Sequence, residues 1–168
     1  LGYVFGPRLN AGGRVGASDL GARLLTAVEE AETEDLARRL ESLNRERQSI
    51  EALVLDEAMN KVTKEPSGAV VIATGYGWHP GVIGIVASRL KERFNRPAIV
   101  ISMDPDSGLG KGSGRSVAGI DLGTCIIAAR QAGLLEQGGG HRMAAGFTIS
   151  SNQLETFGEF IDERVAVS

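Results

Sequence analysis

The spacing of apolar residues changes once along the chain, near residue 66. Before that point, apolar residues recur at the three- and four-residue intervals of one helix face, at Leu36, Leu40, Leu43, Ile50 and Val54. This pattern predicts a long amphipathic helix. We expect it to begin at Thr33, with acidic residues in its positive first turn, and to continue to about Val62. The run at residues 64–68, which contains a proline and a glycine, then ends it.

Two shorter segments precede the predicted long helix. Residues 1–16 are rich in glycine, contain a proline and show no clear period, so we predict a loop or linker there. Ser18 is expected to cap a short helix whose apolar residues are Leu20, Leu24 and Leu25. Residues 1–66 therefore read as a linker loop and a helical arm.

After residue 67 the pattern alternates between strands and helices. Apolar strands at 69–73 and 97–101 flank a predicted helix at 82–93, which is typical of a parallel βαβ unit. We further predict a strand within 113–120, a helix capped by Asp121, a strand at 147–149 and a last helix capped by Ser151. The predicted fold class is α/β: the helical arm, then a compact domain over 67–168 with a small mixed sheet flanked by helices.

Composition places the chain among ordinary globular proteins. The apolar fraction of 42% can fill a core, and no apolar run approaches the roughly 20 residues that span a bilayer. The single cysteine, Cys125, lies in an apolar run, so we expect a buried, inert thiol in a reducing compartment.

The charge is distributed unevenly. The net charge is −3, but residues 75–146 hold eight basic and five acidic residues, so this segment is +3 and the remainder is −6. A local positive field can hold a polyanion on an acidic chain. The alternative is that these are ordinary solvated surface charges.

Two glycine-rich tracts, at 110–116 and 138–146, carry the most specific chemistry. We interpret them as two loops whose bare backbone binds a phosphate-bearing ligand from two sides. Ser113 adds a hydroxyl, Arg115 a fork of donors and His141 an imidazole. The alternatives are a glycine-rich hairpin with surface charges for the first tract and a flexible connector for the second. The interpretation requires Ser113, Arg115 and His141 to share one face.

The segment 75–84 joins a predicted strand to a predicted helix. Such junctions bind ligands in open α/β sheets, and the first N–H groups of a helix attract anions. Trp78 could stack on a base, with His79 beside it. The alternative is that Trp78 belongs to the core and that His79 is a packing or capping residue.

The sequence contains no recognisable catalytic centre. Its two histidines are far apart, and neither has a second ligand at a spacing typical of metal sites. Asp104 and Asp106 lie in a turn and read as turn formers. Ser113 has no evident base other than His141. We therefore expect this polypeptide alone to be inactive as an enzyme.

Several blocks of sequence together carry a resemblance. They are residues 6–14, 43–48, 78–87, 112–116 and 138–146. In this order they resemble the RecJ family of single-stranded-DNA exonucleases, of the DHH phosphoesterase superfamily. Gly12 stands where that family's pattern leads us to expect alanine. The family's Asp-His-His motif does not occur, so the resemblance implies a connecting helix plus a DHH-associated domain, without the catalytic domain.

The resemblance also implies roles for individual residues. Ser113 and Arg115 would hold the 5′-terminal phosphate of single-stranded DNA, and Gly139, Gly140 and His141 would line the neighbouring phosphate site. The remaining residues expected to contact DNA are Arg8, Asn10, Arg47, Gln48 and His79. The catalytic domain would be a partner and would use Mn²⁺ or Mg²⁺, with no cofactor or metal held by this part. DNA repair and recombination in the cytoplasm, with no membrane association, would be the setting.

Two other functions remain open from the sequence. One is a phosphodiesterase for short oligonucleotides or cyclic dinucleotides, which shares the associated domain. The other is a non-catalytic RNA-binding module, because a related domain occurs in alanyl-tRNA synthetases. The long connecting helix favours the exonuclease.

Overall fold

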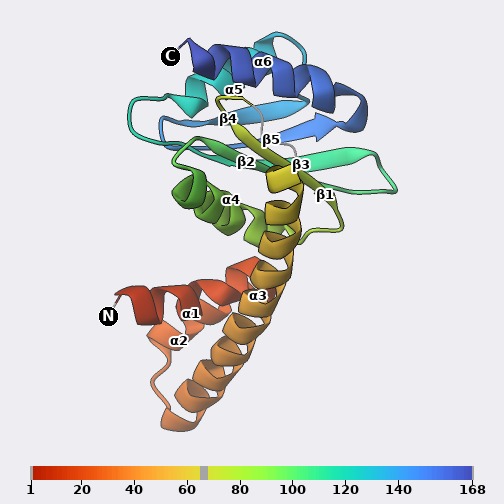
Figure 1. The fold of residues 1–168 in the computed structure, drawn as a ribbon. Coiled ribbons are helices and arrows are strands. Elements are labelled where there is room, and N and C mark those ends of the chain that lie inside the picture. The colour runs from red at the N-terminus through yellow and green to blue at the C-terminus, as the bar shows by residue number, and fades with distance from the viewer. Residues whose placement is uncertain (1, 65–67, 168) are drawn as a thin grey trace. The chain divides into compact units, whose positions relative to one another are not determined.

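The computed structural model describes residues 2–64 and 68–167 (Figure 1). Within these residues the helices are α1 (Gly2–Val15), α2 (Leu20–Thr26), α3 (Glu30–Lys64), α4 (Pro80–Phe94), α5 (Leu122–Gln131), the 3₁₀ turn η1 (Ser151–Gln153) and α6 (Leu154–Ala166). The strands are β1 (Val71–Tyr76), β2 (Ala98–Met103), β3 (Leu109–Arg115), β4 (Gln137–His141) and β5 (Ala144–Ser150). The mixed α/β class is as predicted.

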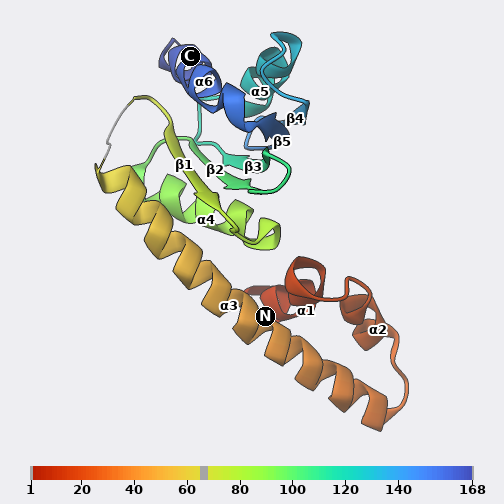
Figure 2. The ribbon, with the colours of Figure 1, turned by 90° about the vertical axis from the view of Figure 1, so that its right-hand side faces the viewer.

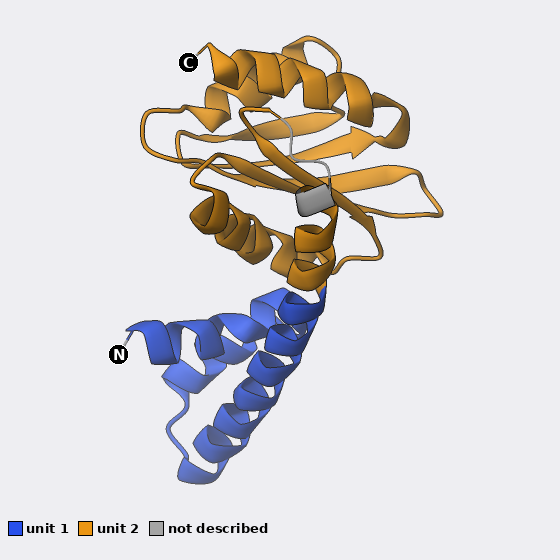
Figure 3. Ribbon diagram, in the orientation of Figure 1, with its two compact units in different colours: residues 1–53 blue, residues 54–168 orange. Residues whose placement is uncertain are grey.

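The chain divides into two compact units (Figure 3). Unit 1 is Leu1–Leu53 and unit 2 is Val54–Ser168, so the division falls within α3. The boundary that we expected from the sequence, between residues 66 and 67, lies outside the described residues.

Unit 1 corrects the prediction for the start of the chain. Residues expected to form a loop form helix α1 instead. Two glycines explain why: a Cβ on Gly12 would lie 2.5 Å from the carbonyl oxygen of Ala17, and one on Gly21 would lie 2.6 Å from that of Leu9. These glycines let α1 and α2 approach closely, so tertiary packing outweighs their low helix propensity.

The helix starts in unit 1 also differ from prediction. Asp19, and not Ser18, occupies the N-cap position of α2. Helix α3 begins at Glu30, ahead of Thr33, whose hydroxyl donates to the carbonyl oxygen of Glu29. The predicted apolar face is confirmed, because Leu36 and Leu40 are buried; together with Leu20 they form the small core of unit 1.

Unit 2 is built on a five-stranded sheet with the order β1-β2-β3-β5-β4. Strands β1 and β2 are parallel and connected through α4, which confirms the βαβ prediction, and the other pairs are antiparallel. Helix α4 lies on one face of the sheet, while α5 and α6 cover the other (Figure 2). The core lies mainly under α5 and α6, where Phe147 and Phe157 pack with ring centroids 4.9 Å apart.

Several boundaries in unit 2 needed correction. The third strand is Leu109–Arg115 and not 113–120, so the glycine tract is itself the strand. Helix α6 begins at Leu154, after a 3₁₀ turn, and Ser151 does not cap it. Asp121 does cap α5, since its carboxylate accepts from the backbone N–H of Thr124 at 3.0 Å.

Two further expectations can be compared with the structure. Cys125 is buried, as expected, and burial raises the pKa of its thiol above the ordinary value. Across residues 2–64 and 68–167, no helix combines the length and the hydropathy that crossing a membrane requires.

Candidate nucleic-acid interface

The two glycine tracts become strands β3 and β4, with β5 between them. Ser113 lies opposite Gly146, and Gly146 lies opposite Gly139; in the next matching row, Arg115 and His141 flank Ala144. Directly opposed residues in antiparallel strands project from the same face. Ser113, Arg115 and His141 therefore share one face, as the sequence interpretation requires. Two strand spacings of about 4.8 Å separate β3 from β4.

The backbone N–H groups of the two glycine tracts do not have the anion-binding role that we expected. We predicted loops whose N–H groups form an anion-binding concavity, and this is wrong, because both tracts lie in the ladder of an antiparallel sheet. What the glycines contribute here is the absence of side chains.

Two glycines on this face have no internal reason to be glycine. A Cβ on Gly139 would meet nothing within 4 Å, and one on Gly146 would meet only a carbonyl oxygen at 3.8 Å. Neither residue has a positive φ. Glycine within a strand often marks the close approach of a ligand or another backbone. We call the surface formed by Ser113, Arg115, Gly139, His141, Ala144 and Gly146 the open face.

Gly140 belongs to the opposite side of β4. A Cβ there would lie 2.4 Å from the carbonyl oxygen of Ala144 and 2.6 Å from Cα of Ala145. Packing against β5 therefore explains this glycine. The structure groups Gly139 with the other predicted phosphate-binding residues of unit 2 and turns Gly140 away from them.

The Ser113–Arg115 pair forms one edge of the open face. Nη1 of Arg115 donates to Oγ of Ser113 at 3.1 Å and to the carbonyl oxygen of Gly114 at 2.7 Å. Because Oγ of Ser113 accepts from the guanidinium, its own hydrogen is available to donate elsewhere. Both side chains are half-buried, so their positions are restrained before any ligand binds.

Gly84 of α4 makes room for this pair. A Cβ on Gly84 would lie 2.8 Å from Nη2 of Arg115 and 3.1 Å from Oγ of Ser113. Sequence reasoning did not single out Gly84. A glycine inside a helical pattern was the available signal, since it costs helix stability and needs a packing or functional reason.

A lysine lies on the same face, two residues before Ser113. Lys111 is exposed, and its Nζ donates to Oγ1 of Thr148 on β5 at 3.0 Å. Strand alternation places Lys111, Ser113 and Arg115 on one side of β3. The open face thus has positive charge along the β3 edge.

The junction before α4 follows the alternative interpretation. Trp78 is buried, its Nε1 donates to the carboxylate of Glu57 at 2.7 Å, and the ammonium of Lys61 lies 5.2 Å from its ring centroid. A base-stacking role for Trp78 is therefore wrong. The indole hydrogen bond is the main cause that lowers the pKa of Glu57.

His79 caps α4. Its Nδ1 accepts from the backbone N–H of Gly81 at 3.0 Å, so the ring hydrogen lies on Nε2, which is left as a donor. Capping accounts for the position of His79, and its contact with DNA stays a prediction.

The four predicted residues of unit 1 lie on two helices. Nε of Arg8 on α1 donates to Glu41 at 2.5 Å, and this guanidinium is the main cause that holds the pKa of the Glu41 carboxyl below its ordinary value. Asn10 and Gln48 are exposed. Arg47 is buried and donates to Asn44 and Glu51 of its own helix. Contact of these residues with DNA stays a prediction.

Metal ligation does not fit the described residues. Within residues 2–64 and 68–167, no group of three or more histidine, cysteine, aspartate or glutamate side chains could hold a metal ion. The open face instead combines a hydroxyl, a guanidinium and an imidazole around a glycine floor.

Comparison with known families decides the assignment. The DHHA1 domain matches residues 67–167, which is more than half of the chain. The chain belongs to the DHHA1 domain family. The match contains every strand of the sheet and the whole open face.

This DHHA1 chain is also similar to proteins named RecJ. It is 41% identical over 156 residues to the single-stranded-DNA-specific exonuclease RecJ of Bacillus subtilis, covering 92% of the chain and 20% of that protein. Among solved structures, RecJ of Thermus thermophilus in complex with Mg²⁺ superposes with a TM-score of 0.84 at 31% identity, covering 98% of the chain and 25% of that one. Exonuclease RecJ bound to manganese gives 0.81 at 32% identity, covering 96% and 40%.

These comparisons confirm the resemblance to the RecJ family and the mixed α/β fold. The DHHA1 chain spans between a fifth and two fifths of the length of these relatives.

Proposed function

We propose that this chain is the substrate-binding part of a 5′→3′ single-stranded-DNA-specific exonuclease, and that the open face binds the 5′-terminal phosphate and the adjoining backbone. One observation carries the proposal: Ser113, Arg115 and His141 project from one face around a floor, at Gly139 and Gly146, that no described side chain fills. The similarity to RecJ supports the choice of single-stranded DNA as substrate.

The chemistry of a strand end suits the Ser113–Arg115 edge. A terminal phosphate has more charge and more non-bridging oxygens than an internal phosphodiester. A guanidinium can donate two parallel hydrogen bonds to such oxygens, and the Ser113 hydroxyl can add a third. The floor at Gly139 and Gly146 then lets the sugar–phosphate backbone approach, and the exposed His141 donates to the next phosphate.

Hydrolysis is assigned to other residues of the enzyme. RecJ has been solved with Mg²⁺ and with Mn²⁺, whereas the described residues of this chain fit no metal site. We therefore propose that the metals belong to a catalytic DHH domain that faces this one, and that the chain's own residues hold and orient the strand end. The 168-residue polypeptide should then lack nuclease activity when Mn²⁺ is supplied.

Arg115→Ala tests the phosphate-binding role. The affinity of the chain is measured for one oligonucleotide with either a 5′-phosphate or a 5′-hydroxyl. Loss of a charge-assisted hydrogen bond should cost about 1.5–3 kcal/mol, or roughly 10- to 100-fold, for the phosphorylated end only. Arg115→Lys should recover part of the loss, because it keeps the charge but not the planar fork.

Arg93→Ala is the matched control. It removes the same charge from the exposed last turn of α4 in the same unit and should leave both affinities unchanged. If Arg115→Ala weakens both oligonucleotides equally, the 5′-phosphate assignment is wrong. Competition by a dinucleotide, by tRNA and by long single-stranded DNA separates the exonuclease from the phosphodiesterase and the RNA-binding module; the proposal expects long single-stranded DNA to compete best.

A further inference from the structure

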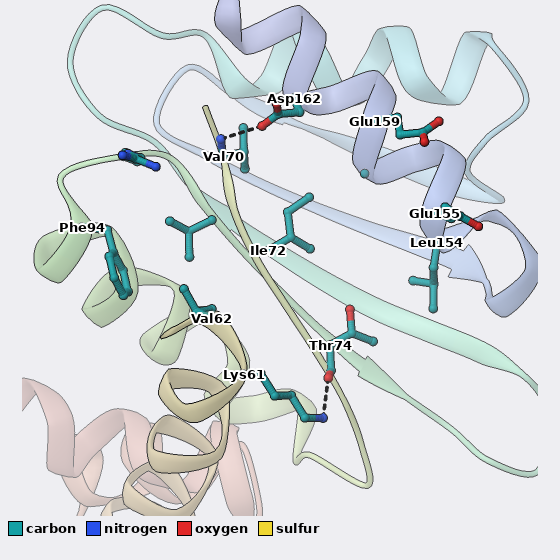
Figure 4. A pocket seen from close by; sticks show the side chains of 13 residues that line it. Lys61, Val62, Val70, Ile72, Thr74, Phe94, Leu154, Glu155, Glu159 and Asp162 are labelled. Atoms are coloured by element: carbon teal, nitrogen blue, oxygen red, sulfur yellow. Dashed lines mark hydrogen bonds between the residues drawn. The ribbon is translucent and has the colours of Figure 1, made fainter. Parts of the chain in front are cut away.

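A groove of about 900 Å³ runs along β1, the edge strand at the opposite end of the sheet from β4 (Figure 4). One wall is the first half of α6, and the other is formed by the ends of α3 and α4. All lining residues belong to unit 2. Neither the open face nor the phosphate-binding residues contribute to it.

On its outer edge, the backbone of β1 forms hydrogen bonds with side chains at both ends of the groove. Between these two points, in the described residues, its outward polar groups have no partner. The N–H of Val71 donates to β2, so the alternate residues Val70, Ile72 and Thr74 turn their polar groups toward the groove. Asp162 accepts from the N–H of Val70 at 3.1 Å, and Lys61 donates to the carbonyl oxygen of Thr74 at 2.7 Å. Within the described part of the chain, neither the N–H nor the C=O of Ile72 has a hydrogen-bond partner on this side.

The α6 wall has two acidic side chains besides Asp162. Glu155 and Glu159 lie one turn apart on α6, line the groove and are both exposed (Figure 4). In residues 2–64 and 68–167, neither carboxylate forms an ion pair. A ligand that enters the groove therefore meets negative charge on this side.

The other wall combines apolar side chains with two cations that already have hydrogen-bond or ion-pair partners. Val62 and Phe94 supply the apolar surface. Lys61 is held by Thr74 and by Glu57, and Arg96 donates to the carbonyl oxygen of Gly68 at 2.9 Å. The two walls thus differ in the kind of side chain that they accept.

We propose that the groove binds an extended segment of a partner protein, which adds a strand to β1 and has a basic residue between two apolar ones. Strand addition to a sheet edge takes affinity from main-chain hydrogen bonds and specificity from alternate side chains. The Ile72 side chain faces α6, since its Cδ1 lies 3.8 Å from the position of a Cβ on Gly158.

The direction of the Ile72 side chain determines which side chains of the partner segment should be basic and which should be apolar. The residue opposite Ile72 would share its face, so a lysine or arginine there covers Ile72 with its stem and reaches Glu155 and Glu159. Its two neighbours would point to the other wall, toward Val62 and Phe94, and should be apolar.

The charge of the groove argues against two other occupants. The carboxylates on α6 would repel a nucleic-acid backbone. A second copy that paired β1 with β1 would bring two acidic α6 walls together, at an unfavourable like-charge cost.

A peptide titration followed by backbone amide NMR of the 168-residue chain tests the proposal. The probes are the capped heptapeptide Ser-Thr-Val-Arg-Val-Thr-Ser and its counterpart with glutamate in place of arginine. The arginine peptide should shift the amide signals of Ile72 and Thr74, slow the hydrogen exchange of the Ile72 N–H, and bind more tightly than the glutamate peptide.

Glu159→Lys and Glu163→Lys form a matched pair of variants. Both residues are exposed on α6, but only Glu159 lines the groove. Glu159→Lys should weaken the arginine peptide about fivefold, the size expected from reversing one exposed carboxylate, and Glu163→Lys should not. The amide spectrum of each variant shows that it is folded.

Three results would overturn the proposal. They are an absence of shifts at β1, equal binding of the two peptides, and protection of Ile72 that appears without peptide as protein concentration rises, which would indicate a second copy. None of them depends on DNA binding, so the proposal stands or falls separately from the proposed function.

Discussion

A Cβ added to Gly112 would lie 2.1 Å from the ring of Phe147, whereas one added to Gly146 would meet only a carbonyl oxygen at 3.8 Å. The two glycines lie on neighbouring strands, near the same point of the sheet, and face opposite sides. On the side of α5 and α6, neighbouring side chains occupy the volume that a Cβ would need. On the open face, the volume is empty.

This comparison separates two uses of glycine in one sheet. Where a large neighbouring side chain occupies the space that a Cβ would need, the glycine belongs to the core. Replacing such a glycine should lower the stability of the fold. Where the space that a Cβ would need is open and φ is ordinary, the glycine contributes nothing to packing. Replacing such a glycine should weaken ligand binding and leave stability unchanged. The following substitutions test this distinction.

Gly112→Ala should have the largest effect. The added methyl collides with Phe147, a buried ring that packs on Phe157 and cannot move away easily. We expect a loss of about 3 kcal/mol in the free energy of unfolding, the upper part of the range for overpacking a core. Urea denaturation measures it, and an unchanged midpoint would show that the core around Phe147 is loosely packed.

Gly146→Ala should act in the opposite sense. Its methyl meets no side chain, so the free energy of unfolding should stay constant or rise by about 0.4–1 kcal/mol, because alanine restricts the unfolded chain. The affinity for a 5′-phosphorylated oligonucleotide should fall by about 1–3 kcal/mol, since the methyl occupies the space left for the ligand. Retained affinity would indicate that the empty space over Gly146 is not used by DNA.

Gly84→Ala should have a smaller effect on ligand binding than Gly146→Ala, again without a loss of stability. The clashing atoms are the tip of Arg115 and the hydroxyl of Ser113, which can move without disturbing the core. Stability should therefore hold or improve, because alanine favours a helix interior. Binding of the 5′-phosphate should weaken by about 0.5–1.5 kcal/mol, the cost of a displaced rotamer. Titration calorimetry with both 5′-ends measures this, and an equal loss for the 5′-hydroxyl strand would contradict it.

The smallest effect concerns the hydrogen bond between Trp78, which precedes α4, and Glu57 of α3. Glu57 accepts from Trp78, and its pKa lies below the ordinary value of 4.5. The carboxylate therefore contributes stability that is complete above about pH 4.5 and is lost as the pH falls through the lower, folded-state pKa. Glu57→Gln should therefore lower the stability slightly at neutral pH and flatten its decline in acid, so that the variant and the parent converge below the folded-state pKa.

Fluorescence of the chain's only tryptophan follows this transition directly. Identical acid profiles for Glu57→Gln and the parent protein would show that the Trp78–Glu57 hydrogen bond does not anchor α4.

Local pattern was enough for much of the fold. The apolar face with Leu36 and Leu40, the parallel β1–α4–β2 unit and the Asp121 cap were all predicted, because each depends on residues close together in the chain. Of the candidate site, the common facing of Ser113 and Arg115 followed from strand alternation once a strand was assumed.

Other features could not be read locally. The glycines of α1 looked like helix breakers, although Gly12 of α1, like Gly21 of α2, leaves room for the two helices to pack closely. The run at Gly138–Gly140 looked like a loop, although pairing with β5 makes it a strand. Gly84 lies against Arg115, which is 31 positions further along the chain, so a local pattern could not connect the two residues.

The amino-acid sequence by itself named the candidate phosphate-binding side chains and predicted many of the short helices and strands, because propensity, capping and periodicity act over a few residues. Only the tertiary structure decided that His141 shares a face with Ser113 and Arg115 and that Gly139 and Gly146 leave a floor between them. Strand order and register produce that arrangement, and both depend on contacts between residues distant in the chain. The groove at β1 has the same origin, since its walls come from three helices that meet only when the sheet is formed.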